Sequence, residues 1–560
     1  MSAFAHTDIR RRALSCLVPL YLATVGLITL AVTRVNAGVF VYTLDDAYIH
    51  LALARWIRVG HYGINAHELA SPSSSVLWPF LLAPFAASPY GEYAPLLINS
   101  VLGLLTLWVI ADLVTAVVSH TPLARPALLS AGLTILLVLT SNTLGLVFLG
   151  MEHSLQLLCA CLVARGLVRF GASGRYDLAT WAAVIVAPLV RYESLGLSGA
   201  FVVFLVLQGR RRAAALTACG FMLPLAGFSL WLLHIGQKAL PASILVKSRS
   251  ADEGLLAGAW SQLIDGLTME VRGPLVAACG LGFLATATLA RDGLLRRIAA
   301  VSCLAVGLHL LVGRYGWFNR YEAYLWGYAW LLCVALGWPA VARRIDAGEW
   351  PPWRVATLTG LVFVTLGAVY IRGVWLTPEA SNNIYGQQYQ MRRFARAWAA
   401  PIAVNDLGLV AYGSDQYVLD LWGLASLDAL AARKQFERDD DITRPPEQDG
   451  PSWLARWTDE RGVELVMIYD AWFGRAIPRG WKPLGDLYYL GNQITAAEAK
   501  VSFYATTEAA HARATELLRG WQAGLPESAG FVFASGPDPH DPHDPHSHHD
   551  AHARAQDPPR

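Results

Sequence analysis

Apolar runs alternate with short polar stretches from the N-terminus to Trp375, and the alternation then stops. Runs of about 20 apolar residues are long enough to cross the ~30 Å hydrocarbon core of a bilayer as helices. We count about eleven such helices, unless the two short runs on either side of Arg191 form one bent helix. The predicted spans are Leu14–Val35, Pro95–Val118, Ala127–Leu149, Ser154–Val168, Leu178–Val190, Leu195–Leu207, Ala213–Ile235, Gly273–Ala290, Ile298–Val312, Ala323–Ala342 and Val355–Trp375.

Arginine collects in the polar stretches at one end of these runs, and the positive-inside rule assigns such clusters to the cytoplasm. An odd number of spans then places the first loop and all residues after Trp375 outside the inner membrane. The apolar segment Ser74–Phe85 is only about half a span long, so we expect an external juxtamembrane or re-entrant helix there. The clusters are Arg10–Arg12, Arg210–Arg212, Arg291 with Arg296 and Arg297, and Arg343–Arg344.

After Trp375 the composition is mixed, which predicts an external α/β domain over residues 376–535. The fold class is therefore mostly α, a polytopic helical bundle over residues 1–375 followed by this domain. Residues 536–560 alternate Asp, Pro and His and predict a disordered tail, with soft-metal binding as the less favoured alternative. Within the domain we expect strands at Ile402–Val404, Tyr417–Leu421 and Glu464–Ile468, and helices at Gln388–Ala399 and Thr507–Gly520.

Composition supports the membrane assignment. Of the 560 residues, 54% are hydrophobic and only 15% are charged, and the mean hydropathy is +0.38. These values exclude an ordinary soluble domain and make the lipid bilayer a partner of the chain. The net charge of +2 and the lack of a basic aromatic patch give no indication of a nucleic-acid partner.

Two adjacent carboxylates, Asp45 and Asp46, follow directly on the first predicted span. Ionisable groups are costly near the hydrocarbon, so carboxylates placed there usually face an aqueous cavity or a partner. Two neighbouring negative charges also raise one pKa, which suits a general base or a cation site. The alternative is a pair of loop acids facing bulk water, and the spacing alone gives it equal weight.

Further charged groups interrupt the apolar pattern on the same predicted side of the membrane. Arginine can bind a phosphate as a bidentate fork and lysine as a point charge, so these cations are candidates for holding a phosphorylated lipid. Anchoring of helix ends is the alternative, with equal weight for Lys238 and Arg314. The groups are Glu152-His153, Arg191 to Glu193, Lys238, Lys247, Arg249 and the stretch from Arg314 to Glu322.

An ordered series of motifs resembles the GT-C glycosyltransferases, membrane enzymes that take sugar from a polyprenyl-phosphate carrier. Within that superfamily the chain looks most like the terminal arabinofuranosyltransferases of mycobacterial-type cell walls and their proteobacterial relatives. The series covers most of residues 1–425, and its specificity lies in the order of the motifs. The motifs are Leu44–Ile49, Gly60–Asn65, Ala70–Trp78, Gly150–His153, Val190–Ser194, Leu240–Ser243 with Lys247, Trp317–Tyr321, Ala403–Gly408 and Val418–Leu424.

The resemblance implies a role for each matching residue. Asp45 would be the general base that deprotonates the acceptor hydroxyl, and Asp46 would orient it, raise its pKa or hold a divalent cation. No other cofactor is implied. Arg191, Lys247 and Arg320 would stabilise the leaving phosphate. The sugar and these groups would be positioned by Tyr48, Glu152, His153 and Glu193, and the cavity entrance would be shaped by Ser71, Ser73 and Trp78.

The implied function is transfer of a pentose-like or hexose sugar, arabinofuranose among them, with inversion, onto an envelope glycan, lipid or protein. Three positions depart from the family pattern, with Tyr192 in place of proline, Ser243 in place of asparagine and Asn319 in place of glycine. They bear on the sugar more than on the reaction. One alternative is an envelope polymer ligase, for which the chain offers only His153 and His309. The non-enzyme alternative is a transporter or flippase, for which mid-membrane acids and repeated halves are expected.

Overall fold

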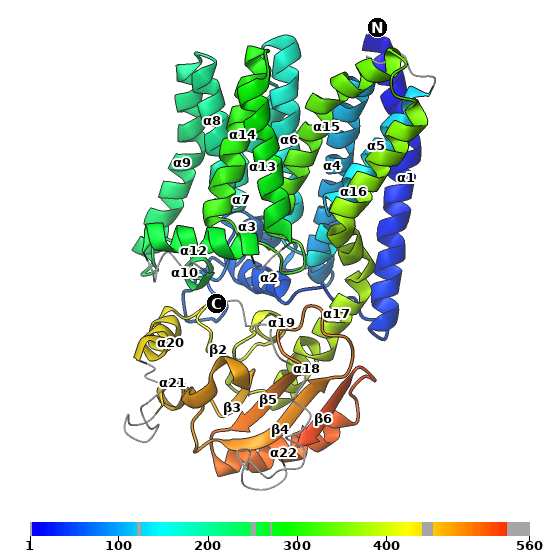
Figure 1. Cartoon of the computed structure of the whole chain (residues 1–560). Helices are drawn as coiled ribbons and strands as arrows, with labels where there is room; N and C mark the ends of the chain where they lie inside the picture. Colours follow the sequence, from blue (N-terminus) through cyan, green and yellow to red (C-terminus); the bar gives the residue numbers. More distant parts are fainter. Residues whose placement is uncertain (1–2, 120–124, 248–253, 269–270, 440–451, 535–560) are drawn as a thin grey trace. The chain divides into compact units, whose positions relative to one another are not determined.

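The computed structural model describes residues 3–119, 125–247, 254–268, 271–439 and 452–534. The chain divides into two compact units, Met1–Pro378 and Glu379–Arg560 (Figure 1). The predicted tail, residues 536–560, lies outside the described residues. Each unit has its own architecture, so each is described by itself.

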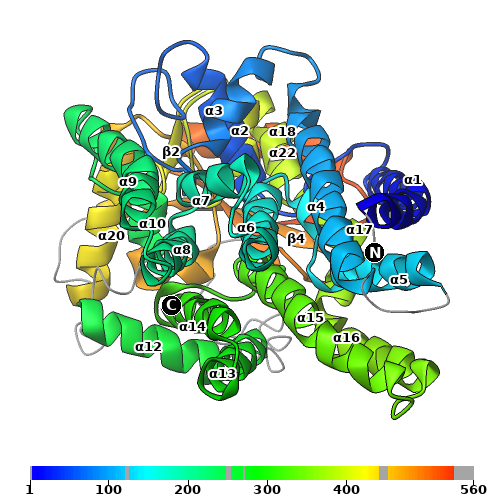
Figure 2. The ribbon, with the colours of Figure 1, turned by 90° about the horizontal axis from the view of Figure 1, so that it is seen from above.

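The N-terminal unit is a bundle of apolar helices, as predicted for a multi-pass membrane protein. In the described residues, nine helical segments are long and apolar enough to cross a membrane, and two shorter apolar helices accompany them. Viewed along the bundle, α6 lies next to α4, α7 and α15 (Figure 2). The helices are α1 (Ala3–Val35), α4 (Ala94–Val118), α5 (Pro126–Thr140), α6 (His153–Ser173), α7 (Leu178–Val190), α8 (Leu195–Leu207), α9 (Arg211–His234), α13 (Arg272–Leu289), α14 (Gly293–Val312), α15 (Ala323–Asp346) and α16 (Pro352–Trp375).

The two short helices beside Arg191 form a hairpin, so the alternative of one bent helix is wrong. α7 ends at Val190, Arg191 is extended with φ −153° and ψ 137°, and α8 begins at Leu195. The chain just after α8 returns to the start of α7, where Arg210 Nη2 donates to the carbonyl of Gly174 at 2.5 Å. An extended residue cannot continue a helix, and the chain reverses there.

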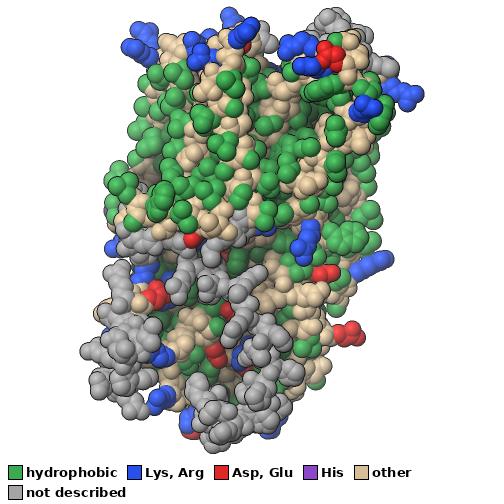
Figure 3. All heavy atoms as spheres, viewed as in Figure 1, with side chains coloured by type: hydrophobic (Ala, Val, Ile, Leu, Met, Phe, Trp, Pro, Cys, Tyr) green, Lys and Arg blue, Asp and Glu red, His purple; other side chains and the backbone are tan. Residues whose placement is uncertain are grey.

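Lys and Arg gather at the end of the bundle where the N-terminus lies, whereas the sides of the bundle are mostly hydrophobic (Figure 3). The four predicted arginine clusters lie at the start of α1, at the α8–α9 and α13–α14 connections and at the end of α15. Successive long helices run in opposite directions, so these points share one end (Figure 1). Its assignment to the cytoplasm stays a prediction.

Short helices cover the opposite end of the bundle (Figure 1). The predicted half-span at residues 74–85 is the pair α3 (Trp78–Leu82) and η1 (Ala83–Phe85). The helix α2 (Asp46–Ile57) was missed by the sequence interpretation, which placed a loop there, although eight of its twelve residues are buried. The other short helices at this end are α10 (Ala242–Lys247) and α12 (Leu255–Thr268).

The C-terminal unit contains one six-stranded sheet of order β2-β1-β3-β5-β4-β6. β1 (Ile402–Val404) pairs in parallel with β2 (Val418–Asp420) and with β3 (Leu465–Ile468), which confirms the three predicted strands. All residues of these strands are buried, as is typical of parallel strands. The antiparallel strands, which the sequence interpretation missed, are β4 (Lys482–Tyr489), β5 (Lys500–Ala505) and β6 (Ala529–Phe533).

In the described part of this unit, six α-helices accompany the sheet, and two of them were predicted. α18 (Gln388–Trp398) and α22 (Glu508–Gln522) match the expected helices to within two residues at each end. α22 is capped by the Thr507 side chain, which accepts from the Ala510 N–H at 3.2 Å. The others are α17 (Thr377–Gly386), α19 (Gly408–Gly413), α20 (Leu427–Asp439) and α21 (Trp453–Glu460).

A buried carboxylate ties helices together near the arginine-rich end. Asp112 of α4 is fully buried and forms ion pairs with Arg10 of α1 and, at 2.6 Å, with Arg169 of α6. Arg165 of α6 lies 3.9 Å from Asp112 and pairs with Asp177, the N-cap of α7. A buried carboxylate needs such partners, and here one carboxylate joins α1, α4 and α6.

We predict that Asp112→Asn destabilises the bundle by roughly 1–3 kcal/mol, because the buried Arg165 then keeps only Asp177 and the partly exposed Arg10 and Arg169 lose a charged partner. The measurement is thermal unfolding of the full chain in detergent. The matched control is Asp8→Asn, which removes an exposed pair with Arg12 (2.9 Å) and should cost about 0–1 kcal/mol. Equal melting temperatures for the two variants would contradict the role of Asp112.

Candidate active site

Four segments far apart in the sequence meet at the bundle end opposite the N-terminus. They are the start of α2, the turn before α6, the η4 turn (Tyr192–Ser194) between α7 and α8, and the loop before α15. Close approach requires a glycine at one point. Gly150 has φ +69°, and a Cβ there would lie 2.6 Å from the Tyr42 ring and 2.8 Å from the Ala47 side chain. The turn carrying Glu152 and His153 can therefore pack directly against the segment that carries the acid pair.

The two adjacent acids have different surroundings. Asp46 is the first residue of α2, and its Oδ2 lies 2.7 Å from Arg320 Nη2. Asp45 is the N-cap residue of α2 and only 5% exposed, and its carbonyl accepts from the Tyr48 N–H at 2.9 Å. The Tyr48 hydroxyl in turn accepts from the backbone N–H of Tyr42. The acids are thus held by helix α2, with Asp46 engaged by a cation.

Arg320 is buried at the centre of the cluster. Its Nη1 donates to the Met151 sulfur at 3.0 Å, and its Nη2 donates to the Tyr321 hydroxyl at 2.8 Å. Its guanidinium carbon lies 4.7 Å from the centre of the Tyr321 ring. The Nε–H of Arg320 is buried and has no partner among the described residues. A buried N–H without an acceptor is costly, and an incoming anion would satisfy it.

The donors of Arg191 are already occupied. Nη1 donates to Glu152 at 2.8 Å and to the Ser74 hydroxyl at 3.2 Å, while Nε and Nη2 form a fork with Glu193 at 3.1 and 2.7 Å. Its guanidinium carbon faces the Tyr321 ring from 5.4 Å. In this arrangement Arg191 joins the turn before α6 to the α7–α8 turn and has little capacity left for a phosphate.

A row of buried groups runs from Ser73 through His50 to Glu152. His50 Nδ1 lies 3.1 Å from the Ser73 hydroxyl, and Nε2 lies 3.2 Å from Glu152 Oε2. Burial by itself would raise the pKa of Glu152, but His50, His153 and Arg191 hold this pKa well below its usual value. Ser73 donates to the Ser75 carbonyl, so its hydroxyl is a structural group and not an activated nucleophile.

His50 was missed as a site residue by the sequence interpretation. It stands four residues after Asp46, and residues at i and i+4 share one face of a helix. That spacing was the available signal, and it was lost because residues 46–57 were interpreted as a loop. Met151 and Tyr321, which contact Arg320, lie within the motifs Gly150–His153 and Trp317–Tyr321, but the sequence interpretation gave them no role.

His153 is the buried polar group with the most unused capacity. It is 1% exposed, and neither ring nitrogen has a hydrogen-bond partner in the described parts of the chain. Its ring packs edge-on against Tyr321, with centroids 6.3 Å apart. Two unused ring nitrogens beside Tyr321 can donate to and accept from a ligand hydroxyl.

The loop that presents Arg320 has an unusual backbone. Gly316, Trp317, Phe318 and Asn319 have positive φ values of 75°, 42°, 59° and 62°. The left-handed region costs roughly 1–2 kcal/mol for each residue with a Cβ, so surrounding contacts must hold this conformation. Asn and Gly tolerate it best, which explains why Asn319 can stand where the resembling family has glycine.

Two buried side chains hold this loop. Asn319 accepts from Arg272 Nη2 at 2.6 Å, donates to the Val369 carbonyl at 3.2 Å and has its own carbonyl bonded by Asn142. Glu322 accepts from the Gly316 N–H at 2.9 Å and from the Tyr370 hydroxyl at 3.0 Å, and lies 3.4 Å from Arg272. Burial raises the pKa of Glu322, although Arg272 and these hydrogen bonds oppose the shift.

The remaining predicted residues lie at the edge of this cluster or outside the description. The Ser71 hydroxyl accepts from the Ala242 N–H at 3.2 Å and donates to Gln237 at 3.3 Å, so it links its segment to the α9–α10 connection. Trp78 is fully buried, and its indole N–H has no partner among the described residues. The side chain of Lys247 lies outside the described residues.

A metal site was predicted only as an option at the acid pair. Among the residues described, no group of three or more His, Cys, Asp or Glu side chains is arranged to hold a metal ion. Asp46 has Arg320 as its cationic partner in this arrangement. A divalent cation at the acid pair therefore stays a prediction.

Comparison with known proteins gives a match to a family model and likenesses to distant solved structures. A model described as a domain of unknown function (DUF8728) matches residues 382–504, within the C-terminal unit. No curated protein matches the chain. The crystal structure of ArnT from Cupriavidus metallidurans bound to undecaprenyl phosphate is 12% identical with a TM-score of 0.45, covering 88% of this chain and 98% of that one. The apo ArnT structure is 13% identical with a TM-score of 0.41, covering 89% and 99%. Both likenesses are too distant to carry a function to this chain.

We predict that Asn319→Ala destabilises the N-terminal unit more than Asn319→Gly does, by roughly 1 kcal/mol. Both variants lose the same amide contacts, so the difference isolates the cost of a Cβ at positive φ. The measurement is the pair of melting temperatures in detergent. If Asn319→Ala were as stable as Asn319→Gly, the loop would not be held in the left-handed conformation.

Proposed function

We propose that this protein is a membrane glycosyltransferase that moves a sugar from a polyprenyl-phosphate donor to a cell-envelope glycan, lipid or protein. The observation that carries the proposal is the Asp46–Arg320 pair beside Asp45, inside a buried cluster at one end of the helical bundle. A lipid-linked donor needs such a place, because its tail stays in the bilayer while its phosphate and sugar enter a polar site. The motif resemblance of residues 44–321 supports the same reaction class.

The proposed reaction is one inverting displacement. The acceptor oxygen forms a bond to the anomeric carbon while the bond between that carbon and the phosphate oxygen breaks. Polyprenyl monophosphate leaves with the electron pair, and Asp45 takes the proton of the acceptor hydroxyl. Asp45 is the proposed base because the motif resemblance gives it that role and because it is buried at the start of α2, directly beside the Asp46–Arg320 pair.

The cations divide into two roles in this proposal. Arg320 contacts the leaving phosphate through its unpartnered Nε–H, with Lys247 as a second cation. Arg191 supports the site indirectly, because its donors hold Glu152 and Glu193 in place. This refines the sequence interpretation, which gave all three cations the phosphate. His153 and Glu193 are the groups proposed to contact sugar hydroxyls.

The finer assignments rest on the resemblance and on the arginine distribution. Arabinofuranose is the proposed sugar, since the ordered motifs look most like arabinofuranosyltransferases. The site and the C-terminal unit are proposed to lie on the periplasmic side of the inner membrane, because the arginine clusters gather at the opposite bundle end. A divalent cation at Asp45 and Asp46 would assist by neutralising charge near the phosphate.

We predict that Asp45→Asn lowers transfer by roughly 10²–10⁴-fold, because the amide cannot accept the proton. The assay incubates purified protein with a panel of polyprenyl-phosphate sugars and an envelope acceptor extract. Asp8→Asn at the other bundle end is the activity control, and melting temperatures verify folding. Full transfer by Asp45→Asn would exclude Asp45 as the base. Turnover with nucleotide sugars alone would overturn the lipid-donor proposal.

We predict that Arg320→Lys lowers kcat/KM for the donor by roughly 10²–10³-fold, because lysine keeps the charge but loses the fork and the Nε–H. Arg344→Lys is the matched control. Arg344 lies in the last turn of α15, is exposed, and pairs at 2.5 Å with Glu349 in the connection to α16. The measurement is donor-dependent transfer rate. An unchanged kcat/KM in Arg320→Lys would show that Arg320 does not contact the phosphate.

A further inference from the structure

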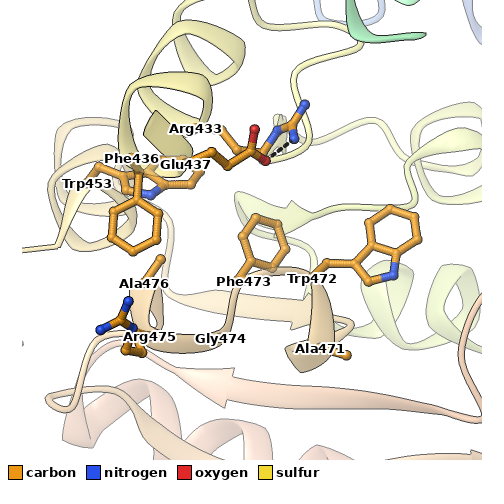
Figure 4. Close-up of a pocket in the computed structure, with 10 residues that line it drawn as sticks. All are labelled: Arg433, Phe436, Glu437, Trp453, Ala471, Trp472, Phe473, Gly474, Arg475 and Ala476. Carbon is orange, nitrogen blue, oxygen red and sulfur yellow. Dashed lines mark hydrogen bonds and ion pairs between the residues drawn. The ribbon is translucent and has the colours of Figure 1, made fainter. Parts of the chain in front are cut away.

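The C-terminal unit contains a pocket that the proposed reaction does not use. Its volume is about 320 Å³, and its floor is formed by residues 471–476, in two short 3₁₀ turns that follow β3 (Figure 4). Residues of α20 and Trp453 of α21 form the walls. β3 is parallel to β1, and in α/β sheets ligands bind beyond the carboxyl ends of parallel strands. The location is therefore one where a ligand is expected.

The pocket is lined by aromatic rings. Phe436, Trp453 and Trp472 are half-buried, so part of each ring remains open to a ligand. Phe473 is buried beneath them, with its ring 6.2 Å from that of Trp453 (Figure 4). Trp472 is held in place by Trp422, with ring centroids 4.4 Å apart. Fixed aromatic faces with two rotatable bonds each provide contact area at little entropic cost.

Polar groups border these rings. Arg433 is 7% exposed, and its guanidinium carbon lies 3.8 Å from the centre of the Trp422 ring. Its Nη1 lies 2.5 Å from Oε1 of Glu437 (Figure 4). The indole N–H of Trp453 is buried and has no acceptor among the described residues. The pocket thus offers a carboxylate acceptor, guanidinium donors and an unused N–H beside apolar faces. The charge of Arg433 is balanced by Glu437, so this guanidinium is not free for an anion, and Arg475 is the other charged residue of the lining.

Sugar rings match this combination, because they present apolar C–H faces to aromatic rings and hydroxyls to polar groups at their edges. A volume of about 320 Å³ is at the small end of ligand pockets and fits one or two sugar units. We propose that this pocket binds a neutral sugar unit of an oligosaccharide. The inference rests on the proposed function in one respect, that the oligosaccharide is part of the acceptor glycan.

The test uses the full-length Asp45→Asn protein in detergent, so that no transfer takes place during the measurement. Saturation-transfer NMR is recorded with trisaccharides of arabinose, galactose, glucose and N-acetylglucosamine, and with inorganic phosphate as the anionic probe. We expect at least one trisaccharide to bind, and Trp472→Ala and Glu437→Gln each to weaken it tenfold or more. Leu490→Ala, which alters an exposed apolar side chain outside the pocket, should leave binding unchanged.

Three results would overturn the proposal: no trisaccharide binds, only phosphate binds, or binding survives both pocket variants. Melting temperatures identify a variant that fails to fold, and the milder Glu437→Gln then decides, since Glu437 is exposed. The outcome is separable from the proposed function. If a trisaccharide bound but the wild-type chain transferred no sugar, the proposed glycosyltransferase function would be wrong and the proposed sugar-binding pocket would stand. In an active enzyme, Trp472→Ala should raise the acceptor KM and leave kcat nearly unchanged.

Discussion

Charged groups that are buried away from water need partners. This constraint shapes the N-terminal unit both at the candidate site and around Asp112, near the arginine-rich end. At one end Arg320 pairs with Asp46 at 2.7 Å, and Arg191 pairs with Glu152 and Glu193. These contacts join the start of α2 to the loop before α15, and the turn before α6 to the α7–α8 turn. A buried pair contributes little net stability, yet losing one partner is costly, so each pair fixes the arrangement of the loops that carry it.

The same constraint explains why the candidate site is built on strained and tightly packed backbone. Four consecutive residues with positive φ precede Arg320, and buried contacts of Asn319 and Glu322 hold them. The surrounding contacts offset the conformational strain of this loop, and the loop places the Arg320 guanidinium between Asp46 and Tyr321. Arg191 is the counterpart, because Glu152, Glu193 and Ser74 accept from most of its N–H donors. Arg191 thus holds the surrounding loops together, whereas Arg320 keeps an unused N–H donor.

The two units suit different chemistry. The bundle offers lipid-facing apolar sides and a buried charged cluster, which fits a reaction on a lipid-linked substrate. The C-terminal unit offers a mixed sheet with an aromatic pocket after β3, which fits the proposed recognition of a sugar chain. An enzyme that extends or decorates an envelope glycan needs both capacities, since its donor is lipid-bound and its acceptor is hydrophilic.

Elements with a local signal could be predicted from the amino-acid sequence. Apolar runs located the long helices, since length and hydropathy suffice to predict a span, and buried β-rich runs located β1, β2 and β3. The sequence interpretation missed α2, a helix of only twelve residues that directly follows the acid pair, because such a segment is too short to be recognised as a span. The antiparallel strands β4, β5 and β6 were also missed, because they are only partly buried and lack the continuous apolar run that marks β1, β2 and β3.

The pairing of the charged residues became evident only from the folded arrangement of the helices. The sequence named Asp46, Arg191 and Arg320 as candidates, but it could not show that Arg320 takes Asp46 while Arg191 takes Glu152 and Glu193. Asp46 and Arg320 are far apart in the sequence. Such pairings follow from the packing of the helices and from the need of every buried charge for a partner. For the same reason, neither the unused hydrogen-bonding capacity of the His153 ring nitrogens nor the pocket after β3 could be predicted from the sequence.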